Sequence, residues 1–234
     1  MRLWSIQSPR AAALLEAGSP LTGAPDFEMT WGWSADHPWG FKQAYDWMRR
    51  AMAERVGSPP ADGAYPVWAW ARPPSITRSG APDMRAMRDS EPCALLEIEV
   101  DPERVLLSDH ESWHMVLNGS ALALTEELDQ RQDARLAELC QKLGLPLDPG
   151  GRLGARHYGH PDVLAFLSDG WSSVFEVEPL AAGRPARMAF SRPFDPEWIR
   201  AEGVSVQACL WRVNPVDVVS VRHFGARPRA RSPA

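Results

Sequence analysis

The sequence predicts a single α+β domain with a mixed, mainly antiparallel sheet and flanking helices, on the basis of two observations. Several segments alternate apolar and polar residues, as strands with one buried face do, for example residues 65–71 (YPVWAWA) and 93–100 (CALLEIEV). Strands and helices do not alternate regularly, which disfavours a doubly wound parallel sheet. We expect the domain to span residues 1–224 and a disordered, arginine-rich tail to occupy residues 225–234.

The first 60 residues predict a strand and two helices. Residues 2–7 alternate as a strand, and Ser8-Pro9 marks a helix start, because serine caps a helix and proline fits its first turn. Residues 19–40 are rich in Gly, Pro and Trp and lack periodicity, so they predict a long loop. Apolar residues then recur at helical spacing over residues 41–56.

The remaining segments predict strands and helices in irregular order. After the strand at 93–100 and a short strand at 105–107, Asp109 can cap a short helix. Further elements are expected at residues 125–143 (helix), 195–203 (helix), 204–213 (strand) and 218–224 (strand). The last two strands meet at Asn214-Pro215, in a hairpin or a tight strand-to-strand corner.

Composition narrows the class of protein. The chain has 234 residues, 44% of them hydrophobic, and no run near the roughly 20 apolar residues of a membrane helix, so no membrane partner is expected. The N-terminus lacks an apolar stretch typical of a signal peptide, so a cytoplasmic protein is expected. The net charge of −5 argues against broad nucleic-acid binding, and three cysteines without a CxxC pair predict free thiols.

Trp68 and Trp70 lie on one face of the strand at 65–71, opposite Tyr65, Val67 and Ala69. Because the other face already has the character of a core face, the two indoles either pack against a helix or loop or form the wall of a pocket for a flat ring. Both interpretations stay open on sequence alone.

The segment HESWH (residues 110–114) places His110 and His114 four residues apart, on one face of a helix. This spacing is a possible half of a metal site, but no third ligand is evident, so no metal is expected. Asp109 and His114 can instead serve as an acid–base pair or bind a polar ligand. The alternative is a capping aspartate beside a solvent-facing histidine.

Four motifs in order, LWSIQS, YDWM with YPVWAW, VLLSDHESWHMVLN and VQACLWRVNPVDVV, resemble an uncharacterised bacterial domain family of unknown function. The resemblance runs from Arg2 to about Phe224, and residues 31–39 look like an insertion relative to it. This family implies no established chemistry.

The order of elements also resembles the ADP-ribosyltransferase fold. There, a first strand of the type LYHIT leads into a helix ending in glycine, as LWSIQ leads into a helix ending at Gly18. The strand lining the nicotinamide pocket would be YPVWAW, and the late strand carrying the acid would be VSVQACLWRV. By position, Ser5 stands where that superfamily often has His or Arg, and Gln207 stands near its Glu.

These two substitutions count against standard catalysis. A carboxylate stabilises the oxocarbenium-like ribose that forms when nicotinamide leaves, whereas a neutral amide does not. Gln207 can still hold a ribose hydroxyl, because an amide both donates and accepts, or it is an ordinary polar residue of an edge strand.

The resemblance implies a protein that binds NAD, as a substrate, or a related nucleotide, and transfers ADP-ribose to an unknown acceptor. The expected catalytic residues are Gln207, Asp109 and His114, and the expected nucleotide-binding residues are Ser5, Gln7, Trp68, Trp70 and Trp211. Two alternatives remain: a non-catalytic module that binds a nucleotide or small molecule, and a different enzyme that uses the Asp109/His114 pair.

Overall fold

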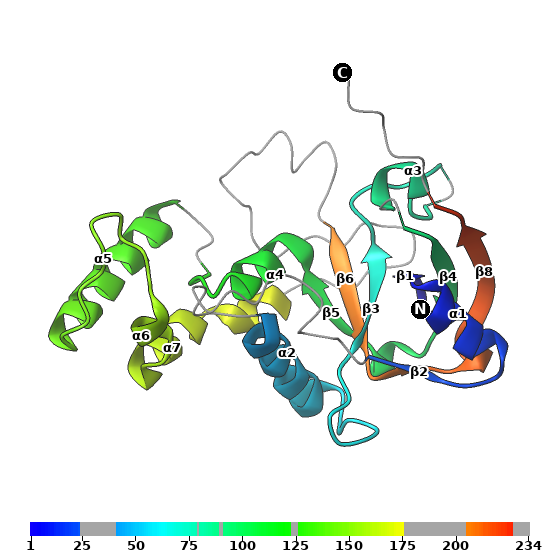
Figure 1. Ribbon diagram of the computed structural model, residues 1–234, viewed down its shortest axis with the longest axis horizontal. Helices are drawn as coiled ribbons and strands as arrows, with labels where there is room; N and C mark the ends of the chain where they lie inside the picture. The colour runs from blue at the N-terminus through cyan, green and yellow to red at the C-terminus, as the bar shows by residue number, and fades with distance from the viewer. Residues whose placement is uncertain (24–40, 79, 89–90, 123–125, 176–204, 227–234) are drawn as a thin grey trace. The chain divides into compact units, whose positions relative to one another are not determined.

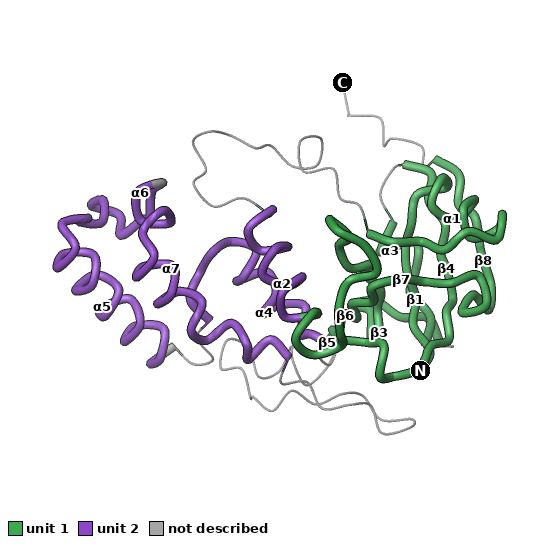
Figure 2. The backbone as a smooth tube through the Cα atoms, turned by 90° about the horizontal axis from the view of Figure 1, so that it is seen from below, with its two compact units in different colours: residues 1–24, 52–107, 205–234 green, residues 25–51, 108–204 purple. Residues whose placement is uncertain are grey.

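The computed structural model describes six stretches of the chain: residues 1–23, 41–78, 80–88, 91–122, 126–175 and 205–226. The chain divides into two compact units (Figure 2). Unit 1 comprises residues 1–24, 52–107 and 205–234, and unit 2 comprises residues 25–51 and 108–204.

Three sequence expectations fall outside the described residues: the helix at 195–203, the segment at 31–39 and most of the arginine-rich tail. The expectation of one domain over residues 1–224 stays a prediction.

A six-stranded sheet has the strand order β5-β6-β3-β1-β4-β8 (Figure 1). Its strands are β1 (Arg2–Gln7), β3 (Val67–Arg72), β4 (Cys93–Glu99), β5 (Leu106–Asp109), β6 (Val206–Leu210) and β8 (Val218–Phe224). The pairs β1–β3, β1–β4, β3–β6 and β4–β8 are all antiparallel. A second, two-stranded sheet pairs β2 (Leu21–Thr22) with β7 (Arg212–Val213). The prediction of a mixed α+β fold with a mainly antiparallel sheet is confirmed.

The helices occupy the segments between these strands. They are α1 (Pro9–Glu16), α2 (Phe41–Arg55), α3 (Met84–Met87), α4 (His110–Leu117), α5 (Glu126–Lys142), α6 (Ala155–Tyr158) and α7 (Pro161–Ser168). Three short 3-10 helices are Pro102–Arg104, Trp171–Phe175 and Pro215–Asp217. Among the helices of the described residues, none has the length and apolar character that crossing a membrane requires.

Two predicted helix starts have the expected caps. The Ser8 hydroxyl accepts a hydrogen bond from the Ala11 backbone N–H at 3.2 Å, ahead of Pro9 in the first turn of α1. The Asp109 carboxylate accepts one from the Ser112 N–H at 2.6 Å and so begins α4. In both cases a side chain satisfies a backbone donor that the helix itself leaves unpaired.

The two faces of the sheet differ in the size of their side chains. On one face Leu3, Leu96 and Ala208 are completely buried. The residues two positions away on β4 and β6, which point to the same face, are also completely buried and are small or aliphatic. Helix α1 lies over this face. Glu16 at the end of α1 contacts His223 of β8 at 2.9 Å, and His223 is the cross-strand partner of Ala94, which points to the same face as Leu96. The opposite face carries the half-buried indoles of Trp4, Trp68 and Trp70 together with the buried Leu95 and Cys209.

The C-terminal strands do not form a hairpin. Strand β6 pairs with β3, whereas β8 pairs with β4 at the far edge of the sheet. The strands β3, β1 and β4 therefore lie between β6 and β8. The chain turns a corner after Val213 through the 3-10 helix Pro215–Asp217, where the Asn214 N–H donates to Asp217 at 2.7 Å. The corner interpretation of Asn214-Pro215 is therefore correct, and the hairpin interpretation is wrong.

Tryptophan also fills the interior of unit 2. The ring of Trp47 is stacked with those of Trp113 and Phe175, with centroid distances of 6.4 and 5.4 Å, and meets Trp171 edge-on at 5.6 Å. Trp113 and Trp171 are 2% and 1% exposed. These aromatic side chains belong to a packed core, and their number in the sequence does not by itself indicate a ligand site.

Candidate functional site

The sheet register brings three residues from distant parts of the chain into one row. Trp4 on β1 is the cross-strand partner of Trp70 on β3, and Trp70 is in turn the partner of Gln207 on β6. Directly opposed residues of antiparallel strands point to the same face, so these three side chains share one side of the sheet. Trp70 and Gln207, chosen from the sequence as site residues, are therefore neighbours.

The same face continues along β3. Trp68, opposite Cys209, alternates with the buried residues of the strand, so it lies on the side of Trp70. Arg72 follows a shift of register after Trp70 and is paired with Val206, so alternation does not assign it to this face. We call Trp4, Trp68, Trp70 and Gln207 the tryptophan face. Each of the three indoles is half-buried.

Arg72 adds a positive charge two residues after Trp70, at the end of β3. Burial lowers the pKa of its guanidinium below the ordinary value, yet the group keeps its charge at neutral pH. A half-buried guanidinium suits a phosphate, which it can bind in a bidentate manner. The indoles of the tryptophan face offer surfaces on which flat rings can stack. The Arg72 guanidinium, further along β3, offers a cation that can bind an anion.

Gln207 offers an acceptor on this face. Its side-chain oxygen Oε1 is buried, and within the described residues no group donates a hydrogen bond to it. Buried polar atoms are almost always hydrogen-bonded, so an acceptor in this position calls for a donor such as a hydroxyl. Gln207 is the cross-strand neighbour of Trp70, so the acceptor lies on a strand position directly beside that tryptophan.

Ser5 and Gln7 do not belong to the tryptophan face. They alternate with Trp4 on β1 and therefore point to the other side of the sheet from Gln207. The completely buried Ser5 hydroxyl donates to the Trp68 backbone oxygen at 2.6 Å, and the Gln7 amide donates to Ser5 at 2.7 Å. Their hydrogen bonds tie β1 to β3, which is a structural role.

Sequence reasoning missed Trp4 and Arg72, although the alternation of RLWSIQ contained the signal for Trp4. It also missed Glu97, the cross-strand partner of Trp4 on β4. Glu97 is paired with Arg2 at 3.3 Å and accepts from Ser220 at 3.1 Å. Three strand spacings separate it from Gln207, roughly 14 Å, so this carboxylate does not replace the acid that Gln207 lacks.

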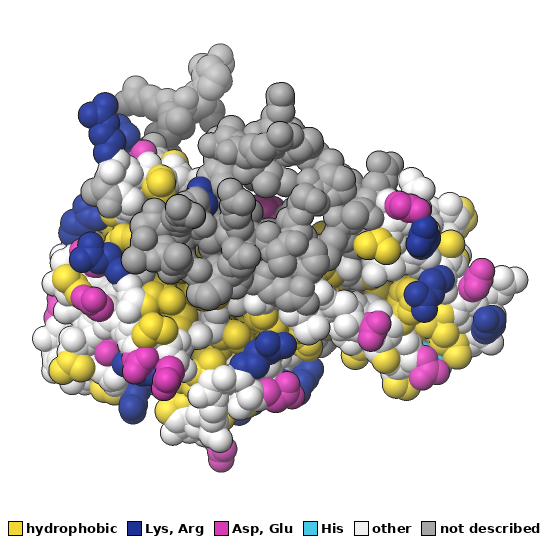
Figure 3. All heavy atoms as spheres, turned by 180° about the vertical axis from the view of Figure 1, so that it is seen from behind, with side chains coloured by type: hydrophobic (Ala, Val, Ile, Leu, Met, Phe, Trp, Pro, Cys, Tyr) yellow, Lys and Arg dark blue, Asp and Glu magenta, His cyan; other side chains and the backbone are white. Residues whose placement is uncertain are grey.

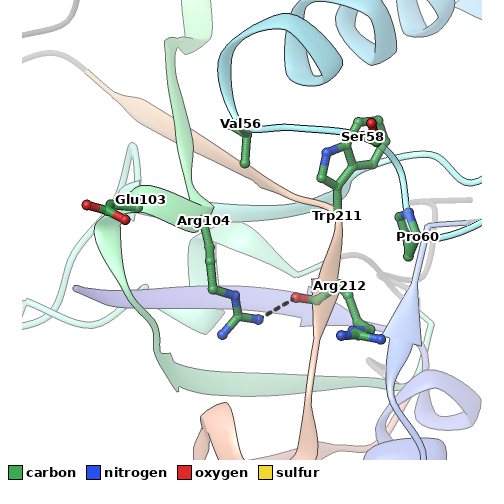
Figure 4. A pocket seen from close by; sticks show the side chains of 7 residues that line it. All are labelled: Val56, Ser58, Pro60, Glu103, Arg104, Trp211 and Arg212. Atoms are coloured by element: carbon green, nitrogen blue, oxygen red, sulfur yellow. Dashed lines mark hydrogen bonds between the residues drawn. The ribbon is translucent and has the colours of Figure 1, made fainter.

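Trp211 lies at a different place in unit 1. Its indole N–H donates to the Gly57 carbonyl at 2.6 Å, and it lines an open cavity of about 320 Å³. Figure 4 shows this cavity, in which the Arg104 guanidinium donates to the Arg212 carbonyl at 3.1 Å. The lining is completed by Val56, Ser58, Pro60 and Glu103.

Asp109 and His114 both belong to unit 2, while the tryptophan face belongs to unit 1. Asp109 is 1% exposed and caps α4, and His114 lies one turn further along this helix with an exposed side chain. The expectation that this pair lies on the side of Trp68 or Trp70 stays a prediction. His114 has a nearer partner in His110, with ring centroids 4.3 Å apart.

The surface charge is mixed. On the face drawn in Figure 3, basic and acidic side chains of the described residues are interspersed, without a continuous basic area. A nucleic-acid surface of the phosphate-binding kind would instead cluster Lys and Arg.

A family model covers almost the whole chain. It is described as a domain of unknown function (DUF3841) and matches residues 2–219. No curated protein and no solved structure matches the chain. The resemblance to an uncharacterised domain family is thus confirmed: the chain belongs to the DUF3841 family.

Proposed function

We propose that this protein binds NAD or a related nucleotide on the tryptophan face, as an ADP-ribosyltransferase-like protein. The resemblance to that fold requires three strands from the beginning, middle and end of the chain to lie side by side. In the sheet, β1, β3 and β6 are consecutive neighbours. The observation that carries the proposal is the buried Oε1 of Gln207, without a donor among the described residues and directly beside Trp70.

The groups of the face and Arg72 each have a part in binding. The indoles of Trp68 and Trp70 provide flat surfaces on which a nicotinamide or adenine ring stacks. Gln207 Oε1 accepts a hydrogen bond from a ribose hydroxyl, and Arg72 pairs with a phosphate oxygen. Aromatic walls with a few placed polar groups are typical of small-molecule sites.

The transfer reaction breaks the bond between nicotinamide and ribose and passes the ribose carbon to an acceptor nucleophile. The positive charge that develops on the ribose is best stabilised by a carboxylate. Because Gln207 is neutral, the second candidate function, a binding module without transferase activity, is favoured by this specific residue. The two candidates share the ligand and differ in whether nicotinamide is released.

The experiment combines binding with product detection. A thermal-shift titration with NAD, ADP-ribose and nicotinamide should show stabilisation by about 2.7 kcal/mol at a ligand concentration of 100 times Kd. For a chain of this length the melting temperature should rise by about 5–10 °C. Mass spectrometry of the same mixtures detects free nicotinamide if the bond is broken.

Two variants and one control decide the interpretation. Trp70→Ala should abolish the ligand-induced shift, whereas Trp47→Ala, which also removes a half-buried indole but in unit 2, should retain it. Gln207→Glu should create or raise nicotinamide release if the face is a degenerate transferase site. A shift that Trp70→Ala leaves intact, or no shift with any of the three ligands, would refute the proposal.

A further inference from the structure

We propose that the N-terminal turns of α4 form a binding site for a divalent transition metal ion of the zinc class. His110, Glu111 and His114 each bring a ligand atom to within 4.8 Å of the other two. The inference concerns unit 2 alone and does not depend on the nucleotide proposal.

The spacing of the three residues is suited to one metal ion. Positions i, i+1 and i+4 of a helix place both imidazoles on one side, and the two rings meet edge to face at an interplanar angle of 77°. Zinc lies about 2.0–2.2 Å from nitrogen or carboxylate oxygen, which requires ligand atoms roughly 3–3.5 Å apart. Ordinary side-chain rotations close the remaining gap.

The backbone that carries these ligands is held in place. The other side of α4 buries Ser112, Trp113 and Val116, and the Trp113 ring meets that of Tyr45 edge-on at 5.9 Å. Rigid support of this kind reduces the ordering that binding would require. The buried Asp109 carboxylate at the N-cap offsets the positive end of the helix dipole, which would otherwise disfavour a cation there.

The chemistry of the donors indicates the metal. Two imidazoles and one carboxylate match zinc and its neighbours in the first transition row better than Mg²⁺ or Ca²⁺, which prefer oxygen ligands alone. The described residues supply three ligands, so a fourth position is left for water or a substrate group, as in catalytic zinc sites.

This proposal departs from the expectation that no metal is bound, and the experiment below decides between the two. The sequence HESWH is itself an H-E-x-x-H pattern, in which two histidines on a helix bind zinc beside a glutamate. The third ligand is the glutamate inside the motif, one residue after His110.

The test uses the full-length protein after removal of metal with a chelator. Zn²⁺ affinity is measured by competition with a chromophoric chelator, and Co²⁺ is added as a spectroscopic probe. We expect one equivalent of Zn²⁺ to bind, and a Co²⁺ spectrum without thiolate charge-transfer bands, since the ligands are histidine and carboxylate rather than cysteine.

His114→Ala is the main variant, because His114 is exposed and its loss should leave the apo fold unchanged, as checked by thermal melting without metal. Loss of an outer-shell partner alone costs about 10–100-fold in metal affinity, so loss of this ligand should cost at least about 100-fold. Glu111→Gln should also weaken binding, by about 10-fold or more. The matched control is His223→Ala, which removes an exposed histidine of unit 1 and should bind like the parent protein.

Equal Zn²⁺ affinity in the parent protein and His114→Ala would overturn the site. Unchanged affinity in Glu111→Gln would overturn the assignment of Glu111 as a ligand. A parent protein that binds no Zn²⁺ while melting as a folded protein would overturn the whole inference.

Discussion

Replacement of Arg104 tests whether one ion pair holds the C-terminal corner of the sheet. The Arg104 guanidinium donates to both carboxylate oxygens of Asp217, at 2.8 and 2.9 Å. Asp217 also accepts from the Asn214 N–H, and its side chain is 7% exposed, compared with 38% for Arg104. Arg104→Ala therefore leaves a buried carboxylate whose remaining hydrogen bonds come from Asn214.

The expected cost lies between two reference cases. An exposed ion pair contributes about 0.2–1 kcal/mol, and removal of one partner from a fully buried pair costs about 3–5 kcal/mol. Because one partner is buried and the other is partly exposed, we expect Arg104→Ala to lower the free energy of unfolding by about 2–3 kcal/mol. Urea denaturation at pH 7 measures this change as a lower midpoint with an unchanged slope. A loss below about 0.5 kcal/mol would refute the reasoning, because it would assign the pair to the exposed class.

The contribution of the Arg104–Asp217 ion pair to stability should decrease as the pH falls. Burial on its own would raise the pKa of Asp217, but the hydrogen bonds from Arg104 and Asn214 lower it by more, so the net pKa lies below its ordinary value. The contribution of a carboxyl with a depressed pKa is fully present above its unfolded pKa of about 3.9 and is lost as pH falls through the folded pKa. The stability difference between the parent protein and Arg104→Ala should thus persist from pH 7 to about pH 5 and shrink below pH 4. A stability difference between the two proteins that grows on acidification would contradict this prediction.

Three further predictions concern packing and thiols. Trp113→Ala, at a side chain 2% exposed, should cost about 3–5 kcal/mol of unfolding free energy in urea denaturation. Gly23→Ala would place a Cβ 2.3 Å from a backbone oxygen and should lower the melting temperature, while Gly225→Ala, with open space around it, should not. Burial raises the pKa of the Cys209 thiol well above its ordinary value, so a disulfide reagent at pH 8 should modify the half-buried Cys93 and spare Cys209 until the protein unfolds.

Much of the fold could be predicted because its signals are local. Alternation located the strands, and the caps at Ser8 and Asp109 fixed two helix starts, since each depends on residues only a few positions apart. The path of the chain after Val213 could not be predicted in the same way. Whether β8 returns beside β6 or crosses to β4 depends on contacts between segments more than 100 residues apart, which leave no local pattern.

The candidate site could be predicted in part for the same reason. Alternation within VWAWAR placed Trp68 and Trp70 on one face, but the pairing of Trp70 with both Trp4 and Gln207 depends on strand order. The resemblance aligned Ser5 with a catalytic residue by position along the strand. The register then placed Ser5 on the face opposite Gln207, a difference of one residue that reverses the direction of a side chain.

Two groups of tryptophans among the described residues differ in how deeply they are buried. Trp113 and Trp171 are almost completely buried and fill a core, where a large ring contributes by removing apolar area from water. Trp4, Trp68 and Trp70 are half-buried on the face of the sheet opposite Leu3 and Leu96. Indole is costly to leave in contact with water unless a ligand or partner covers it, and the acceptor of Gln207 beside it adds a polar requirement that an apolar partner would not meet. A ligand with a flat ring and a hydroxyl group would satisfy both demands at once, and this is the reasoning behind the nucleotide that we propose.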